Sequence, residues 1–248
     1  MNKKKLALYA GVPAAIVAIL MGMYFSGVRL LQTIAVMPYL ENVAPNSRRE
    51  FGLLEFVEHA LIIAALIISV HAAIQARILI LRSLFIFISA AILFLFLEEI
   101  DYGLHYYEFM AGVPPEQIAT VRNLHNIGDR TSQMKHIADF AMGFAFVFAL
   151  LPLRRAKSAW VRFFAPDPYL ALTLILAVLT SRIAHTLDDQ GLGVGIRSNI
   201  SEFRELVTFY IGLMYTLELS RRARLEPPVA TSAPAPPAQD REVPRDAG

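Results

Sequence analysis

The feature that most constrains this chain is a series of apolar segments long enough to cross a lipid bilayer. A helix rises about 1.5 Å per residue, so roughly 20 apolar residues cross the ~30 Å of hydrocarbon in a membrane. Of the 248 residues, 56% are hydrophobic and only 18% are charged, which is more apolar surface than a soluble domain of this size needs. The sequence therefore predicts an all-α integral membrane protein. Its bundle should contain about six transmembrane helices, at residues 6–27, 53–74, 79–99, 137–153, 168–187 and 203–219.

These spans form one predicted transmembrane domain, residues 1–225. The remaining residues, 226–248, are rich in proline and alanine and have no apolar period, which predicts a disordered cytoplasmic tail. The long loop between the third and fourth spans contains Pro114-Pro115-Glu116, followed by residues 117–125. Proline is favoured in the first turn of a helix, so this segment predicts a short amphipathic helix in the loop.

Basic residues orient the predicted bundle. Most of them lie at alternate ends of successive spans and therefore on one side of the membrane, and these are Lys3, Lys4, Lys5, Arg77, Arg82, Arg154, Arg155, Lys157, Arg162, Arg221, Arg222 and Arg224. The positive-inside rule makes this side cytoplasmic, which predicts a multi-pass membrane protein with both termini in the cytoplasm. The net charge of +2 gives no reason to expect a nucleic-acid partner. The absence of cysteine excludes disulfides, thiolate zinc sites and iron–sulfur clusters.

Ionisable residues gather at the opposite, outer ends of the spans. Counted from the nearest cytoplasmic basic residue, Glu58, Glu98, Asp139 and Glu205 share a depth of roughly 22 to 29 Å, and five of the six histidines also lie on this side. Ionisable groups near hydrocarbon are costly and are usually kept for function. The predicted metal ligands are therefore Glu58, His59, Glu98, Glu99, His125, His136, Asp139, His185 and Glu205. Three further acids at this level, Asp188, Asp189 and Glu202, fit ordinary solvated loop positions better than a site.

Histidines and carboxylates that converge inside a helical bundle are typical ligands of zinc and iron. We therefore expect a divalent metal near the outer leaflet, with Glu98 or Asp139 as the proton acceptor in hydrolysis or oxidation of a membrane lipid or another amphiphile. Two other functions remain open. These are an ion- or proton-coupled transporter and a structural or haem-binding membrane subunit.

Two short motifs resemble a known family. Glu98-Glu99-Ile100-Asp101-Tyr102-Gly103, followed after the loop by Asn123-Leu124-His125-Asn126, is similar to the Glu-Glu-x-x-x-Gly segment and Asn-Leu-His-Asn motif of an uncharacterised family of bacterial polytopic inner-membrane proteins. The resemblance covers only this part of the chain. It implies a location in the bacterial inner membrane and no particular activity.

Overall fold

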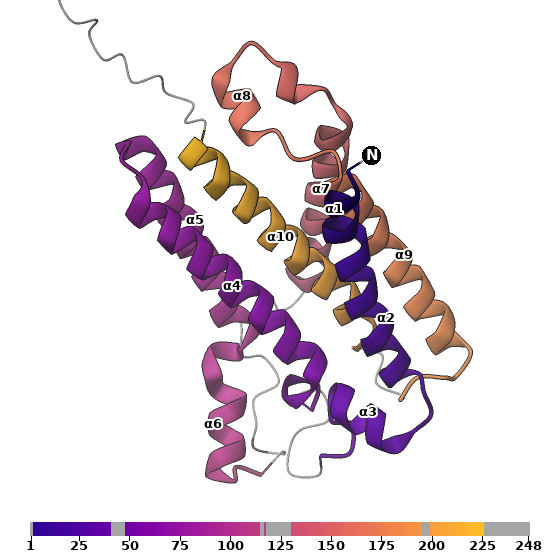
Figure 1. The fold of residues 1–248 in the computed structure, drawn as a ribbon. Helices are drawn as coiled ribbons and strands as arrows, with labels where there is room; N and C mark the ends of the chain where they lie inside the picture. The colour runs from indigo at the N-terminus through magenta and orange to yellow at the C-terminus, as the bar shows by residue number, and fades with distance from the viewer. Residues whose placement is uncertain (1, 41–47, 115–116, 118–129, 195–198, 226–248) are drawn as a thin grey trace, which may run out of the picture.

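A computed structural model of the chain describes residues 2–40, 48–114, 117, 130–194 and 199–225 (Figure 1). Throughout these residues the regular secondary structure is helical. Apart from Pro114 and Gln117, the predicted loop helix lies outside the described residues, as does the tail beyond residue 225. In chain order the elements are α1 (Lys3–Leu6), the π-turn η1 (Ala7–Gly11), α2 (Val12–Tyr24), α3 (Arg29–Val36), η3 (Arg49–Phe51), α4 (Leu53–Gln75), α5 (Leu79–Glu99), η4 (Asp101–Gly103), α6 (Leu104–Ala111), α7 (Arg130–Leu150), η7 (Leu153–Arg155), α8 (Ala159–Phe164), α9 (Leu170–Asp189) and α10 (Asn199–Leu225).

Within the described chain, four helical segments are long and apolar enough to cross a membrane, rather than the six that the sequence predicts. They are Lys3–Tyr24, Leu53–Gln75, Leu79–Glu99 and Leu170–Asp189. The fourth and sixth predicted spans correspond to α7 and α10. The apolar part of α7 is short, Phe140–Leu150, because charged residues occupy its first half. In α10, charged residues such as Arg204 and Glu218 interrupt the apolar sequence. The four apolar helices indicate a multi-pass membrane protein.

The long helix α10 occupies the centre of the bundle (Figure 1). It packs between α4 and α9, while α5 covers α4 and α7 packs on α9. The helix α2 contacts both α9 and α10. At one end of the bundle lie α3 and α6, and at the other end lies α8 (Figure 1). The beginnings of α4 and α10 meet at the first of these ends, which we call the acidic end because it holds Glu55, Glu58 and Glu202.

The residue before α4, Gly52, lets α3 pack directly against the acidic end. A Cβ atom on Gly52 would lie 2.4 Å from the carbonyl oxygen of Ala35 and 2.5 Å from the Cα of Val36. Both of these α3 residues are buried in the main apolar core, together with Leu54 and Phe203. Only glycine leaves room for this approach of one backbone to another. The helix α3 therefore covers the first turn of α4.

A proline shapes the first transmembrane segment. Pro13 has no N–H group, so it cannot bond the carbonyl of Tyr9 four residues earlier, and its ring disturbs the helix there. The chain forms a π-turn over Ala7–Gly11 just before it. The hydroxyl of Thr173 on α9 donates a hydrogen bond of 2.5 Å to the freed carbonyl of Tyr9, and Tyr210 on α10 donates one of 2.6 Å to the carbonyl of Leu8. These two bonds satisfy backbone groups that hydrocarbon cannot solvate.

Charged residues fasten the helices together at the opposite end, which we call the basic end. Asp167 pairs with Lys5 and with Arg154, the latter at 3.1 Å, and Glu218 on α10 pairs with Arg154 and Arg222. Burial alone would raise the pKa of Asp167, but the hydrogen bond from Lys5 and the charge of Arg154 hold this pKa below its ordinary value. The network joins the N-terminal helix, the segment before α9 and the end of α10.

Candidate metal centre

Three glutamates from two helices meet at the acidic end. Glu55 and Glu58 lie three residues apart in the first two turns of α4, so they share one face of that helix. Glu202 lies in the first turn of α10. Each residue offers a carboxylate oxygen, and these oxygens all lie within 4.8 Å of one another. The three residues are 3%, 1% and 3% exposed, respectively. This spacing allows one metal ion to contact all three carboxylates.

The protein does not satisfy the carboxylate of Glu58 by itself. Neither of its oxygens has a hydrogen-bond partner within the part of the chain that the structure describes. In addition, the carboxylates of Glu55, Glu202, Glu205 and Glu99 lie close enough to act on Glu58 electrostatically. A charged carboxylate buried among others is very unfavourable unless a cation or a proton neutralises it. Glu58 is therefore the residue of this group that most needs a cation or a proton.

The donor set narrows the choice of metal. The three glutamates supply oxygen only, and oxygen donors suit magnesium, calcium and manganese, and also iron in carboxylate-rich sites. Zinc sites usually include histidine nitrogen or cysteine sulfur. Of the two metals that the sequence analysis favoured, iron fits this group better than zinc.

Several predicted ligands are not part of the three-glutamate group. The ring of His59 lies edge-on to that of Phe96 on α5, with 5.8 Å between their centroids. The carboxylate of Glu98 is buried and accepts a hydrogen bond from the hydroxyl of Tyr102. His185 is exposed on α9. These three side chains have other surroundings and lie outside the group whose oxygens converge.

The remaining predicted ligands divide into two sets. Glu99 and Glu205 are electrostatic neighbours of Glu58 and belong to the periphery of the group. His125 lies outside the described residues, as do the side chains of His136 and Asp139 within α7. Their proposed roles therefore stay predictions.

Two of the three converging glutamates were not among the predicted ligands. Glu202 was interpreted as a solvated loop residue, and this interpretation was wrong, because Glu202 is buried in the first turn of α10. Glu55 shares its helical face with Glu58, but it lies nearer the predicted end of the span. The sequence did contain a signal for both residues. Glu55 and Glu58 are three residues apart, and Glu202 and Glu205 repeat this spacing.

An apolar layer separates the three glutamates from the charged network at the basic end. One and two turns beyond Glu58, the buried residues on α4 are Ile62 and Ala65. One turn beyond Glu202, the buried residues on α10 are Leu206 and Val207. The three glutamates therefore lie at one end of the bundle, which suits chemistry or binding on one side better than a path through the molecule.

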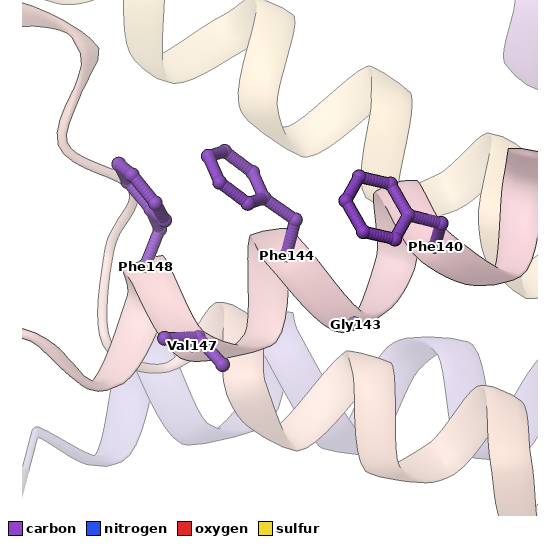
Figure 2. Close-up of a pocket in the computed structure, with 5 residues that line it drawn as sticks. All are labelled: Phe140, Gly143, Phe144, Val147 and Phe148. Atoms are coloured by element: carbon purple, nitrogen blue, oxygen red, sulfur yellow. The ribbon is translucent and has the colours of Figure 1, made fainter.

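The surface of α7 carries a different feature, an apolar hollow of about 360 Å³. Figure 2 shows the rings of Phe140, Phe144 and Phe148 along one side of the helix, and Gly143 and Val147 also line the hollow. Adjacent rings contact each other, with centroids 6.4 and 4.1 Å apart. The hollow is lined by apolar groups only, so it offers surface for hydrocarbon chains but no group for catalysis.

The chain matches no protein-family model, no curated protein and no solved structure. The function therefore has to be inferred from the geometry of the acidic end.

Proposed function

We propose that this chain is a multi-pass membrane protein that binds a divalent metal ion through Glu55, Glu58 and Glu202 and uses it for chemistry on a lipid or another amphiphile. The observation that carries the proposal is the carboxylate of Glu58, which is 1% exposed, lacks a hydrogen-bond partner among the described residues and faces two other buried carboxylates. Burial of such a group costs several kcal/mol unless it is neutralised. A divalent cation would neutralise it and would bind all three side chains.

The position of the site supports an amphiphilic substrate. The three glutamates lie in the first two turns of α4 and the first turn of α10, at the beginning of an apolar span. A lipid presents its polar headgroup at this level, where the hydrocarbon ends. A bound divalent cation supplies Lewis-acid or redox chemistry for hydrolysis or oxidation. Glu98, which is buried beside Tyr102 at the same end, is the proposed proton acceptor, with Asp139 as the alternative.

The orientation in the membrane follows from charge. The basic end contains Lys5, Arg154 and Arg222 in one network, and further basic residues lie nearby in the sequence. Basic residues favour the cytoplasmic side of a bacterial inner membrane. We therefore propose that the basic end is cytoplasmic and that the glutamate site lies near the outer leaflet.

Metal binding is the direct test. Purified protein is stripped with a chelator and titrated with Mg²⁺, Ca²⁺, Mn²⁺ or Fe²⁺, while bound metal and thermal unfolding are measured. A specific ligand at about 100 times its Kd stabilises a fold by about 2.7 kcal/mol. We expect one of these ions to raise the unfolding temperature of the wild type but not of Glu58→Gln. Asp189→Asn is the matched control, because Asp189 is exposed at the end of α9. Failure of all four ions to bind the wild type would refute the proposal.

The chemical part of the proposal needs a separate assay. Protein in lipid nanodiscs is incubated with and without the metal that binds, and the lipids are analysed by mass spectrometry for hydrolysed or oxidised products. We expect products that require both the metal and Glu58. If metal binds but no lipid or amphiphile is converted, the metal site stands and the enzymatic role is rejected.

A further inference from the structure

The helix α7 has one face that packs on the bundle and one that does not. On the packed face, Ala149 is buried and Phe146 lies against the same apolar cluster, which includes residues of α9. On the other face, which carries the hollow of Figure 2, Phe140, Phe144 and Val147 are 76%, 54% and 53% exposed. A continuous apolar surface of this kind usually marks a binding site or a surface that meets lipid.

The apolar length of α7 matches one leaflet of a bilayer. Its apolar part is Phe140–Leu150, which is about 16 Å long at about 1.5 Å per residue. Half of the ~30 Å hydrocarbon core is about 15 Å. The helix finishes at the basic end, since Arg154, just beyond it, pairs there with Asp167 and Glu218. The hollow therefore spans the depth of one acyl chain in the leaflet at the basic end.

Tight turns keep the following residues close to this end of α7. The N–H of Leu151 donates a hydrogen bond of 3.1 Å to the carbonyl of Val147, so the helical winding continues to Leu151. Next, the N–H of Arg155 donates one of 2.9 Å to the carbonyl of Pro152. Basic residues therefore follow the apolar face directly, with no extended segment between them.

Two of these basic residues carry charge that the protein does not neutralise. Arg155 and Lys157 are exposed, and neither side chain has an ion pair or a hydrogen bond within the part of the chain that the structure describes. Their neighbour Arg154 differs, because it pairs with Asp167. Residues 151–166 include no acidic residue. The end of α7 therefore presents positive charge that is available to an anion.

The only tryptophan of the chain marks the level of the lipid headgroups. Trp160 lies in α8, three residues after Lys157, and its ring stacks on that of Phe164 with 6.0 Å between the centroids. Tryptophan is enriched where the hydrocarbon meets the headgroups. Basic residues at this level attract anionic lipids of the cytoplasmic leaflet.

We propose that the exposed face of α7 binds a phospholipid with an anionic headgroup. One acyl chain lies in the hollow along Phe140, Phe144 and Phe148, and the headgroup contacts Arg155 and Lys157. Charge favours this occupant over a zwitterionic lipid, because only an anionic headgroup has a net charge that complements the two bases. A second copy of the chain fits less well, because a symmetric contact across this face would bring like charges together.

A fluorescent reporter in the hollow tests the preference. Trp160→Phe removes the only tryptophan, and Phe144→Trp then places one in the hollow. Protein is incorporated into nanodiscs of phosphatidylcholine brominated in its acyl chains, which quenches tryptophan on contact, and unbrominated phosphatidylglycerol is added in increasing amounts. Each basic residue contributes about fivefold to the binding of anionic lipid, so two contribute about thirtyfold. We expect half of the quenching to be lost at about one phosphatidylglycerol in thirty lipids.

Charge variants of the reporter protein locate the headgroup. Arg155→Gln combined with Lys157→Gln should abolish the preference, so that half of the quenching is lost only when half of the lipid is phosphatidylglycerol. Arg77→Gln combined with Arg221→Gln is the matched control, because it removes the same charge from exposed residues elsewhere at the basic end. This control should keep the preference of the unaltered reporter.

Four results would overturn the proposal. They are an unaltered reporter without preference, a preference that survives loss of both bases, an equal loss in the control, and a reporter that brominated lipid does not quench. The last result would show that another protein surface covers the hollow. Because the glutamates lie at the opposite end of the bundle, none of these results would bear on the proposed metal site.

Discussion

Replacement of Gly52 with alanine should destabilise the acidic end strongly for so small a change. The added Cβ would lie 2.4 Å from the carbonyl oxygen of Ala35 and 2.5 Å from the Cα of Val36. Both are backbone atoms, so no side-chain rotation can relieve the contact. To restore ordinary van der Waals separation, the end of α3 must move by about 1 Å. Overpacking of this kind costs about 1–3 kcal/mol, and we expect a value in the upper part of that range.

Unfolding of purified protein in a denaturing detergent, followed by circular dichroism, measures this cost. Gly212→Ala is the matched control, because Gly212 lies within α10 and a Cβ there meets no atom within 4 Å. Alanine should stabilise that helix by up to about 1 kcal/mol. The displacement of α3 should also weaken metal binding, since Gly52 immediately precedes the helix that carries Glu55 and Glu58. Equal stability of Gly52→Ala and the wild type would refute this reasoning.

Three other replacements test separate parts of the molecule. Glu58→Leu should stabilise the metal-free protein by about 1–4 kcal/mol, because it removes an uncompensated buried carboxylate, and should abolish stabilisation by Mn²⁺; a lower unfolding temperature in metal-free buffer would contradict this. Thr173→Val should cost about 1–3 kcal/mol in the same detergent titration, because the carbonyl of Tyr9 loses its donor, whereas Thr173→Ser should retain most of the stability. Asp167→Asn should lower the unfolding temperature near neutral pH. Because the folded-state pKa of Asp167 lies below its ordinary value of about 4, its ion pairs stabilise the fold above that pH and are lost as the pH falls further. The difference between wild type and variant should therefore vanish in acid, and a difference that persists there would contradict the assignment.

The long apolar helices were predictable because their length and composition have few alternative explanations. The predicted spans at 53–74, 79–99 and 168–187 agree closely with α4, α5 and α9. Short helices were harder to predict. The eight-residue helices α3 and α6 lie in segments that the sequence presents as loops, and their packing, such as that of α3 on Gly52, depends on contacts distant in sequence.

The site was predictable only in part, because it also depends on contacts between residues distant in sequence. The depth of Glu58 and its helical phase were visible in the sequence, and Glu58 is central to the buried group. The burial of Glu202 was not visible, because it depends on the packing of α10 against α4 rather than on the residues near Glu202. Histidine placement was also misleading, since His59 faces an aromatic ring and His185 is exposed. Residues at a common depth need not point in a common direction.

The parallel pairing of α4 with α10 has a consequence for biosynthesis. At translation rates of about 5–20 residues per second, the ribosome completes α10 on the order of ten seconds after α4. During this interval Glu55 and Glu58 have entered the membrane without the helix that supplies Glu202. Insertion scales assign an aspartate at the centre of a membrane helix a cost of about 2.5–3.5 kcal/mol, which the apolar remainder of α4 can offset. The nascent N-terminal half is therefore an intermediate whose glutamate group stays incomplete until the last helix arrives.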